Sequence, residues 1–395
     1  MFTASENLVE GGDGVKKKKV LHIISGLDTG GAEMMLYKLL AAFPNQAIRS
    51  EVISLGRNGP ITKRIIDLGI NVQSLHLGSG WIGSITGIFL LIKYTRNFCP
   101  HVIQGWMYHG NIAATIASFF VFQQVIVCWN IRQTLQDLKN EKIITRLLIR
   151  LSPFLSRLPK YILYNSIISA EHHEKIGFYK KSRMIIPNGF DINIFRPQDQ
   201  VRSSIRNNLG LNLKQVIGHI ARYHPKKDHE TLLRATRRIV DQIPETVVLL
   251  IGRGVTEENC RLRSIMEQLD LERNILFLGE RADVSQIMVA MDVLVSSSAW
   301  GEGFPNVIGE AMASGVACVA TDVGESRNIV GDAGTVVPDS SPEMLADAVI
   351  ELLNLPVGKR FDIGCRARER IATNFSIQDI ARQYLRAYGI ERSPH

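Results

Sequence analysis

Short apolar runs alternate with amphipathic stretches along the whole chain. The first half contains the runs KVLHIIS, EVISL, NVQSLHL, HVIQGW, QVIVCWN, YILYNS and RMIIPNG, and the second half contains QVIGHIA, TVVLLIG, NILFLG, DVLVSSS, VACVAT and GTVVP. Short runs rich in branched residues favour strands, and helical patterns lie between them, so the sequence predicts parallel sheets with helices on both faces. Two such series predict an α/β chain of two doubly wound domains.

A polar, turn-rich segment separates the two series. It is PNGFDINIFRPQDQ (187–200), which we predict to be the hinge, with a surface turn inside one large domain as the alternative. We therefore expect a basic-ending lead over 1–18, a first domain over 19–190 and a second over 191–375. The last stretch, 376–395, has the spacing of an amphipathic helix and is expected to cross back to the first domain.

Composition supports two ordinary globular cores, since the chain has 395 residues, of which 45% are hydrophobic. Residues 1–200 hold 23 Lys and Arg against 13 Asp and Glu, so the net charge of +8 comes from the first half. This asymmetry favours an anionic partner, such as a membrane surface or a phosphate-bearing substrate. No paired Cys/His finger spacing or aromatic ribonucleoprotein motif is present, so we predict no nucleic-acid partner.

Five scattered cysteines, an odd number, predict reduced core thiols in a cytosolic protein. The run after Lys16 to Lys19 imitates a signal peptide, but His22 and Asp28 interrupt it. The stretches 81–92 and 112–129 are too short, or too broken by glutamines, to span a bilayer. We predict a soluble or peripheral protein.

The strongest chemical signal is EGFPNVIGE (302–310), which follows the strand-like DVLVSSS and leads into a helical pattern. At the carboxyl end of a parallel strand, free N–H groups and a helix N-terminus attract anions. Glu302 and Glu310 edge this anion site, so it suits a ligand with both phosphate and hydroxyl groups, such as a sugar nucleotide. Further predicted donor contacts in the stretch are Gly303 and the amides of Phe304, Asn306 and Val307.

Two cations, Arg222 and Lys227, lie on the loop after the first strand of the second domain. Such cations can neutralise a diphosphate as it leaves a sugar, and the alternative is a solvated basic loop. The placement opposite EGFPNVIGE favours the functional interpretation. Gly252 and Arg281, which follow the next two strand runs, complete the predicted donor site.

The first domain adds weaker candidates. Gly30 and Gly31, after the first strand, let the backbone approach a ligand, or simply form a tight turn. His109 follows the fourth strand and could bond a sugar hydroxyl from across the interdomain boundary, or cap its own helix. His224 and His229 are expected at the surface. No Asp-x-Asp pair or Cys/His ligand spacing is present, so we predict no metal.

The segment 139–162 combines an apolar helical stripe with many cations. The apolar members are Ile143, Ile144, Leu147, Leu148, Leu151, Phe154, Leu155 and Leu158, and the basic ones are Lys139, Lys142, Arg146, Arg150, Arg157 and Lys160. Such a segment can lie on an anionic membrane, or dock its stripe on the first domain's sheet. Pro153 is expected to kink or divide the helix.

Together these motifs resemble the retaining glycosyltransferases of family four, which have the GT-B fold, over residues 19–390. Glu302 and Glu310 fit that family's E-x7-E motif with its interior Gly-Phe-Pro, and Arg222 and Lys227 fit its Arg/Lys pair. The segments GGAE and IPNGFD also fit.

The resemblance implies that Glu302 contacts the donor sugar, Glu310 binds the ribose, and Arg222 and Lys227 stabilise the departing diphosphate. His109 would contact the sugar from across the boundary. The resemblance also implies a metal-independent front-face displacement without a cofactor, in which a donor phosphate oxygen accepts the acceptor's proton. Since Tyr223 and His224 stand where many members have small or apolar residues, the sugar pocket is expected to be unusual.

We therefore expect transfer of a hexose or N-acetylhexosamine from a nucleotide sugar held by the second domain, with UDP favoured over GDP. The acceptor, held by the first domain, is expected to be a saccharide on a polyprenyl diphosphate, at the cytoplasmic face of the inner membrane, in surface polysaccharide or lipopolysaccharide synthesis. One alternative is a sugar-nucleotide epimerase of similar fold, which would need catalytic acids in the first domain. The other is a noncatalytic membrane-associated binding subunit, which should have lost a charged donor contact.

Overall fold

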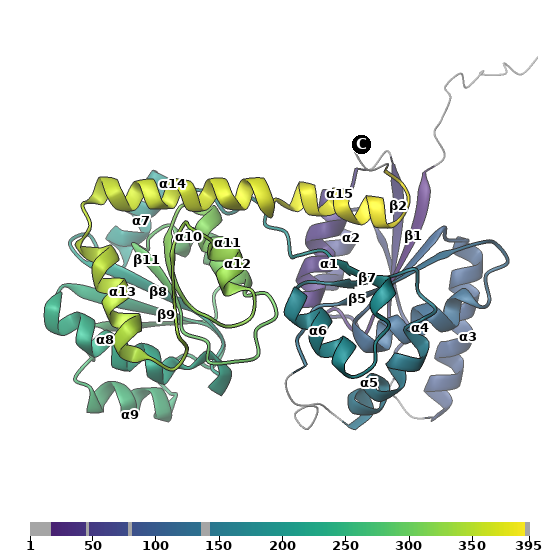
Figure 1. Cartoon of the computed structure of the whole chain (residues 1–395), viewed down its shortest axis with the longest axis horizontal. Helices are drawn as coiled ribbons and strands as arrows, with labels where there is room; N and C mark the ends of the chain where they lie inside the picture. Colours follow the sequence, from purple (N-terminus) through teal and green to yellow (C-terminus); the bar gives the residue numbers. More distant parts are fainter. Residues whose placement is uncertain (1–16, 45–46, 78–80, 136–142, 392–395) are drawn as a thin grey trace, which may run out of the picture.

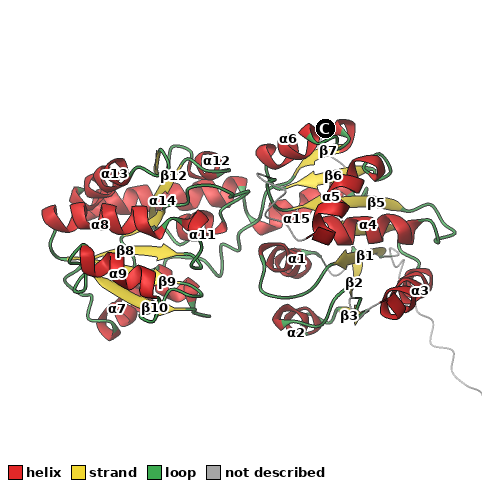
Figure 2. Ribbon diagram, turned by 90° about the horizontal axis from the view of Figure 1, so that it is seen from below, coloured by secondary structure: helices red, strands yellow, loops and turns green. Residues whose placement is uncertain are grey.

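Two parallel sheets, each covered by helices on both faces, form the two lobes of the molecule (Figure 1). The computed structural model describes residues 17–44, 47–77, 81–135 and 143–391. The first sheet has seven strands in the order β3-β2-β1-β4-β5-β6-β7, and the second has six in the order β10-β9-β8-β11-β12-β13 (Figure 2). Each of the apolar runs predicted as a strand overlaps one. The predicted doubly wound α/β class is therefore confirmed.

The strands of the first sheet are β1 (Lys18–Ile24), β2 (Ile48–Ser54), β3 (Asn71–Ser74), β4 (Val102–Trp106), β5 (Ile126–Ile131), β6 (Tyr161–Tyr164) and β7 (Arg183–Ile185). Its helices are α1 (Gly31–Ala42), α2 (Pro60–Ile66), α3 (Trp81–Phe98), α4 (Met107–Ser118), α5 (Ile143–Leu155) and α6 (Ile167–Lys175), with the short 3₁₀ helix η2 (Lys180–Ser182).

The strands of the second sheet are β8 (Gln215–Ile220), β9 (Thr246–Ile251), β10 (Ile275–Gly279), β11 (Val293–Ser296), β12 (Ala317–Thr321) and β13 (Thr335–Val337). The remaining helices are α7 (Asp199–Asn208), η3 (Pro225–Lys227), α8 (His229–Gln242), α9 (Cys260–Gln268), α10 (Val284–Met288), α11 (Asn306–Ala313), α12 (Ser326–Val330), α13 (Pro342–Asn354), α14 (Val357–Asn374) and α15 (Ile377–Ala387).

Apolar clusters cover both faces of each sheet. In the first domain α1, α2 and α15 pack on one face, and α3, α4 and α5 contribute to the clusters on the other. In the second domain α8, α9 and α13 form one layer, while α11, α12 and α14 form the other. The central strands are buried on both faces, which explains why their sequences are continuously apolar rather than alternating.

The chain crosses between the domains twice, and the two crossings pair with each other. The segment after β7 carries Phe190, whose N–H donates to Phe375 O at 2.8 Å, and Ile377 N donates back to Phe190 O at 2.9 Å. α14 spans about 27 Å at 1.5 Å per residue and leads directly into α15 (Figure 1). The two domains are therefore joined by paired backbone rather than by one free linker.

α15 docks on the first domain through aromatic side chains that carry a hydroxyl. Ser376 caps its N-terminus, and its apolar positions recur at helical spacing from Ile377 onward. The hydroxyl of Tyr384 accepts a 2.8 Å hydrogen bond from Asn130 Nδ2 on β5, and the hydroxyl of Tyr388 donates to Gln104 on β4. These bonds satisfy polar groups that would otherwise be buried without partners.

The structure departs from the sequence-based expectations at several points. Pro153 does not divide the helix, because α5 continues to Leu155. Cys99, Cys260 and Cys365 are exposed rather than in the core, while Cys128 and Cys318 are buried and all five thiols are free. Much of the lead over 1–18 and the cations Lys139 and Lys142 lie outside the described residues.

Within the described part of the chain, no helix combines the length and the apolar character needed to cross a membrane.

Gly309 provides a test of how tightly the crossing segment packs on α11. A Cβ built at Gly309 would lie 2.1 Å from Cζ of Phe190, so we expect Gly309→Ala to lower the free energy of unfolding by about 1–3 kcal/mol. Gly358→Ala is the matched control, because a Cβ there meets nothing within 4 Å and alanine favours the helix. Urea denaturation of both variants measures the difference, and equal stabilities would contradict this packing.

Candidate active site

Loops that follow strands of the two sheets meet at the boundary between the domains. Ile167 N donates to Glu325 Oε1 at 3.1 Å, and Asn188 Nδ2 donates to Asn306 Oδ1 at 2.7 Å. A Cβ built at Gly303 would lie 3.3 Å from the Asn165 side chain. The stretch 302–310 therefore lies directly against the first domain. We call this region the interdomain site.

The centre of the interdomain site is an ion pair between two predicted residues. Lys227 Nζ lies 2.5 Å from Glu302 Oε1, and the two side chains are only 17% and 11% exposed. Ser298 Oγ donates to the same carboxylate oxygen at 3.1 Å. The structure thus brings together the basic loop and the acidic end of EGFPNVIGE, as the sequence predicts.

The basic loop is held by the strand next to it. Asp228 adopts a left-handed conformation with φ of 44° and caps α8 by accepting from Thr231 N at 3.1 Å. Ser297 Oγ donates to the carbonyls of Lys227 and Asp228, and Ala299 N donates to Lys226 O at 2.9 Å. These bonds fix the loop against the end of β11, from which Glu302 follows.

Charge and burial act in opposite directions on Glu302. Burial raises the pKa of this carboxyl, but the charge and hydrogen bond of Lys227, the charge of Lys226 and the hydroxyl of Ser298 outweigh it, so the net pKa is lowered. Burial lowers the pKa of Lys226. The charge of Glu302 opposes this shift, and the charges of Lys227 and Arg222 add to it. Glu302 is therefore ionised at neutral pH, with the cations Lys227 and Lys226 near it.

Arg222 is exposed at the start of the loop. Burial lowers the pKa of His224, and the charges of Arg222, Lys226 and Lys227 lower it further. His229, predicted at the surface, is instead buried, with its ring 4.8 Å from that of His219. Burial lowers the pKa of His219 to about 3 and that of His229 to about 4, so both rings are neutral beneath the basic loop.

Gly252 packs against the base of this loop. Its φ is +148°, and a Cβ there would lie 2.1 Å from the carbonyl of Ala221. Only glycine fits such a position without strain. Arg281, after β10, forms a bidentate pair with Asp283, at 2.8 and 2.7 Å.

α11 presents an uncapped N-terminus at the boundary. Its cap residue, Pro305, provides no side-chain hydrogen bond, so the first amides, at Asn306 and Val307, lack a side-chain partner there. Phe304 is buried, stacked on Phe190 and edge-on to Phe375. Its side chain belongs to the core, and Gly303 precedes it on the first domain's side of the loop.

A buried arginine of the first domain supports the same helix start. Arg132 Nη1 donates to Ile186 O at 2.8 Å and to Asn188 Oδ1 at 3.1 Å, and Asn188 in turn donates to Asn306. Burial lowers the pKa of Arg132 to about 9, so it remains charged at neutral pH. Asn188 lies in the IPNGFD segment, but no role was predicted for it from the sequence, and Arg132 lies in no motif identified there.

Glu310 lies apart from the Lys227–Glu302 pair and bonds a residue of the first domain. Lys38 Nζ on α1 donates to Glu310 Oε1 at 3.0 Å. Sequence reasoning missed Lys38, Lys226 and Ser298. The run PKKD signalled Lys226 and the SSS triplet signalled Ser298, whereas nothing local distinguishes Lys38.

The first-domain candidates are less closely engaged. His109 is half-buried in the first turn of α4, and burial lowers its pKa, so the ring is neutral. No hydrogen bond between described residues joins it to Glu302 or Lys227. Gly30 caps α1, and Gly31 borders open space, since a Cβ there meets nothing within 4 Å.

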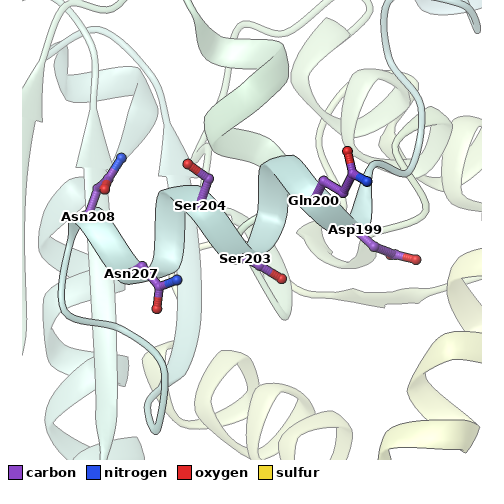
Figure 3. A pocket seen from close by; sticks show the side chains of 6 residues that line it. All are labelled: Asp199, Gln200, Ser203, Ser204, Asn207 and Asn208. Atoms are coloured by element: carbon purple, nitrogen blue, oxygen red, sulfur yellow. The ribbon is translucent and has the colours of Figure 1, made fainter.

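Two hollows of the surface lie away from the predicted donor residues. One of about 540 Å³ runs along α7 and is lined by polar side chains (Figure 3). Another of about 670 Å³ borders α7 and α14. Neither is lined by a predicted donor residue, and the interdomain site is identified by its charges and its helix N-terminus. The described residues hold no cluster of three or more His, Cys, Asp or Glu side chains placed to bind a metal ion.

The chain is similar in sequence and in fold to known glycosyltransferases. Residues 214–355 match the family Glycosyl transferases group 1. The putative glycosyltransferase EpsF of Bacillus subtilis is 26% identical over 324 residues, which cover 78% of this chain and 79% of EpsF. A phosphatidyl-myo-inositol mannosyltransferase of Mycolicibacterium smegmatis is 31% identical over 209 residues, which cover 51% of this chain and 50% of that protein.

Among solved structures, Anabaena HepE in complex with UDP superimposes with a TM-score of 0.82, at 22% identity, covering 94% of this chain and 99% of HepE. HepE has also been solved with UDP-glucose. The similarity establishes the GT-B fold for this chain.

The Lys227–Glu302 pair makes a pH-dependent contribution to stability that can be measured. Because the folded pKa of Glu302 is lowered, its stabilisation is present above the ordinary carboxyl pKa and is lost as the pH falls through the lowered value. We expect Lys227→Met to cost about 2–3 kcal/mol at pH 7, by leaving a buried carboxylate unpaired, and less near pH 4.

Urea denaturation at the two pH values checks this expectation, with the exposed Lys359→Met as the control. A cost for Lys227→Met that does not change with pH would contradict the pairing.

Proposed function

We propose, from the premise that this chain is a member of the group 1 glycosyl transferases, that it moves a hexose or N-acetylhexosamine from a nucleoside diphosphate sugar to a saccharide hydroxyl, with retention at the anomeric carbon. The observation that carries the proposal is the Lys227–Glu302 pair, flanked by Lys226 and Arg222. An acid that can accept from sugar hydroxyls and cations that can hold a diphosphate stand side by side, as the two halves of such a donor require.

In this proposal the site neutralises the charge of the departing diphosphate. As the bond from the anomeric carbon to the diphosphate oxygen breaks, negative charge grows on the leaving group. Lys227 and Arg222 stabilise that charge, together with the uncapped start of α11. Lys227 pairs with Glu302 in this structure, so a bound donor would replace one anionic partner of the lysine with another.

Retention follows in this proposal from a front-face displacement. The acceptor oxygen forms its bond to the anomeric carbon on the side from which the diphosphate departs. The acceptor's proton passes to the departing phosphate oxygen, so no side-chain base is required. We propose that the cationic groups, rather than a metal, neutralise the diphosphate, with Glu302 held ionised to accept bonds from the sugar hydroxyls. His109, neutral and half-buried, contacts the sugar from the first domain.

The donor is proposed to be a UDP-sugar, which the UDP and UDP-glucose complexes of the structural neighbour HepE support. Gly252 gives the nucleotide close access to the backbone, and Glu310 binds the ribose. Arg281 would have to leave Asp283 to take part. Gly30 and Gly31 border the acceptor.

The acceptor is proposed to be a saccharide on a polyprenyl diphosphate, in the synthesis of a bacterial surface polysaccharide. The name of the mannosyltransferase relative, which specifies a phosphatidylinositol substrate, supports a lipid-borne acceptor. On α5, Ile143, Ile144, Leu147 and Phe154 are 76%, 68%, 66% and 79% exposed. With Arg146, Arg150 and Arg157 beside them, this face suits the anionic cytoplasmic surface of the inner membrane.

Activity assays test the proposal directly. A screen of labelled UDP- and GDP-sugars against lipid-linked saccharides should yield a product whose anomeric configuration matches that of the donor. Lys227→Ala should reduce kcat about 10²–10³-fold, because it removes a preorganised cation, while the exposed Lys359→Ala should not. An altered sugar still attached to its nucleotide, formed without acceptor, would instead indicate an epimerase, and binding without turnover would indicate a noncatalytic subunit.

Liposome flotation tests the membrane face. Binding should require anionic lipid and fall as salt rises, since each cation contributes about 1 kcal/mol through a screened field. Replacing Ile143 and Leu147 by serine should weaken it. Leu213→Ser, at a 91% exposed leucine of the second domain, is the control. Binding that ignores lipid charge and salt would remove the peripheral-membrane proposal.

A further inference from the structure

Lys38 and Glu310 form an ion pair that joins the two domains. Lys38 Nζ lies 3.0 Å from Glu310 Oε1, and the side chains are 14% and 18% exposed. The residues are 272 positions apart, and they come from α1 and α11. The Lys38 bond goes to Oε1, and no described residue donates a hydrogen bond to Oε2 of Glu310. Oε1 is therefore occupied by Lys38, and Oε2 can accept a hydrogen bond from a ligand.

Aromatic residues of the crossing segment enclose the same ammonium. Lys38 Nζ lies 5.9 Å from the ring centroid of Phe190 and 5.8 Å from that of Phe195. The Phe190 ring fits against α11 because Gly309, next to Glu310, has no side chain. These cation–π contacts hold the cation where two domains and their connection meet.

The placement of Lys38 is rigid on the first-domain side. Its neighbours Met35, Leu36, Leu39 and Leu40 are buried in the core beneath α1. Because the helix backbone cannot shift without disturbing that core, the lysine presents its charge to α11 only when the domains stand close together, as they do here. A partly buried Glu310 without this cation would lose both an electrostatic partner and a fixed orientation.

We propose that Lys38 is a positioning residue for the donor: by holding Oε1 of Glu310 it directs Oε2 to the ribose hydroxyls, and so couples ribose binding to the approach of the two domains. This inference rests on the proposed function, in which Glu310 binds the ribose. A lysine of the acceptor-side domain thereby contributes to affinity for a ligand bound by the other domain. The coupling is reciprocal, since ribose binding must stabilise the Lys38–Glu310 contact by the same free energy.

Calorimetry with UDP, GDP and their 2′,3′-dideoxy forms tests the inference. For whichever base the wild type binds, Lys38→Met should weaken binding of the ribonucleotide on the order of tenfold, within the usual range for coupled sites. It should leave the dideoxy form nearly unchanged, because that form lacks the hydroxyls. Glu310→Gln should do the same, and the double variant should lose no more than either single one. Lys38→Arg should retain the discrimination.

Lys63→Met, at an exposed lysine of α2, is the control and should change neither affinity. Thermal unfolding of each variant checks that it is folded. Equal losses for the ribo and dideoxy forms, unchanged binding, or tighter binding by Lys38→Met would overturn the inference while leaving the proposed function intact. A wild type that binds neither UDP nor GDP would overturn both.

Discussion

A carboxylate that has lost most of its water needs a cation beside it, and the Glu302–Lys227 pair meets that requirement at the boundary of the two domains. The pair depends on the fold in a specific way. β8 and β11 are neighbouring parallel strands, so the loops that leave their carboxyl ends emerge together. The Ser297 and Ala299 bonds then fix the basic loop against the acidic one. The charges therefore meet because of strand order, although they lie 75 residues apart in sequence.

Separate polar contacts join the two domains near this pair. Arg132 and Asn188 connect the end of the first sheet to the start of α11, and Lys38 reaches Glu310 one turn later. Phe190 lies between these contacts, and its backbone pairs with the second crossing at Phe375. The residues that would hold a donor are consequently linked to those that set the spacing of the domains. This physical connection suits an enzyme that must bring a donor and an acceptor together from two sides.

Local patterns predicted the strands well, because buried parallel strands are short, apolar and bounded by turns. They also predicted that Glu302 and Lys227 would lie close together, since both residues follow strands whose order the α/β pattern constrains. Long-range packing decided the rest. His229 looked exposed in a run of polar residues, yet it lies under the basic loop against His219. Lys38 likewise meets Glu310 only through the folding of both domains. No local pattern encodes such contacts.

The most direct measurement of the central claim is a crystal structure with UDP bound. The account predicts the diphosphate between the start of α11 and the side chains of Arg222 and Lys227, with the Lys227–Glu302 distance lengthened from 2.5 Å as the lysine turns to phosphate. It also predicts a ribose hydroxyl on Glu310. UDP found in the hollow beside α14, with the Lys227–Glu302 pair undisturbed, would contradict the assignment of the interdomain site as the donor site.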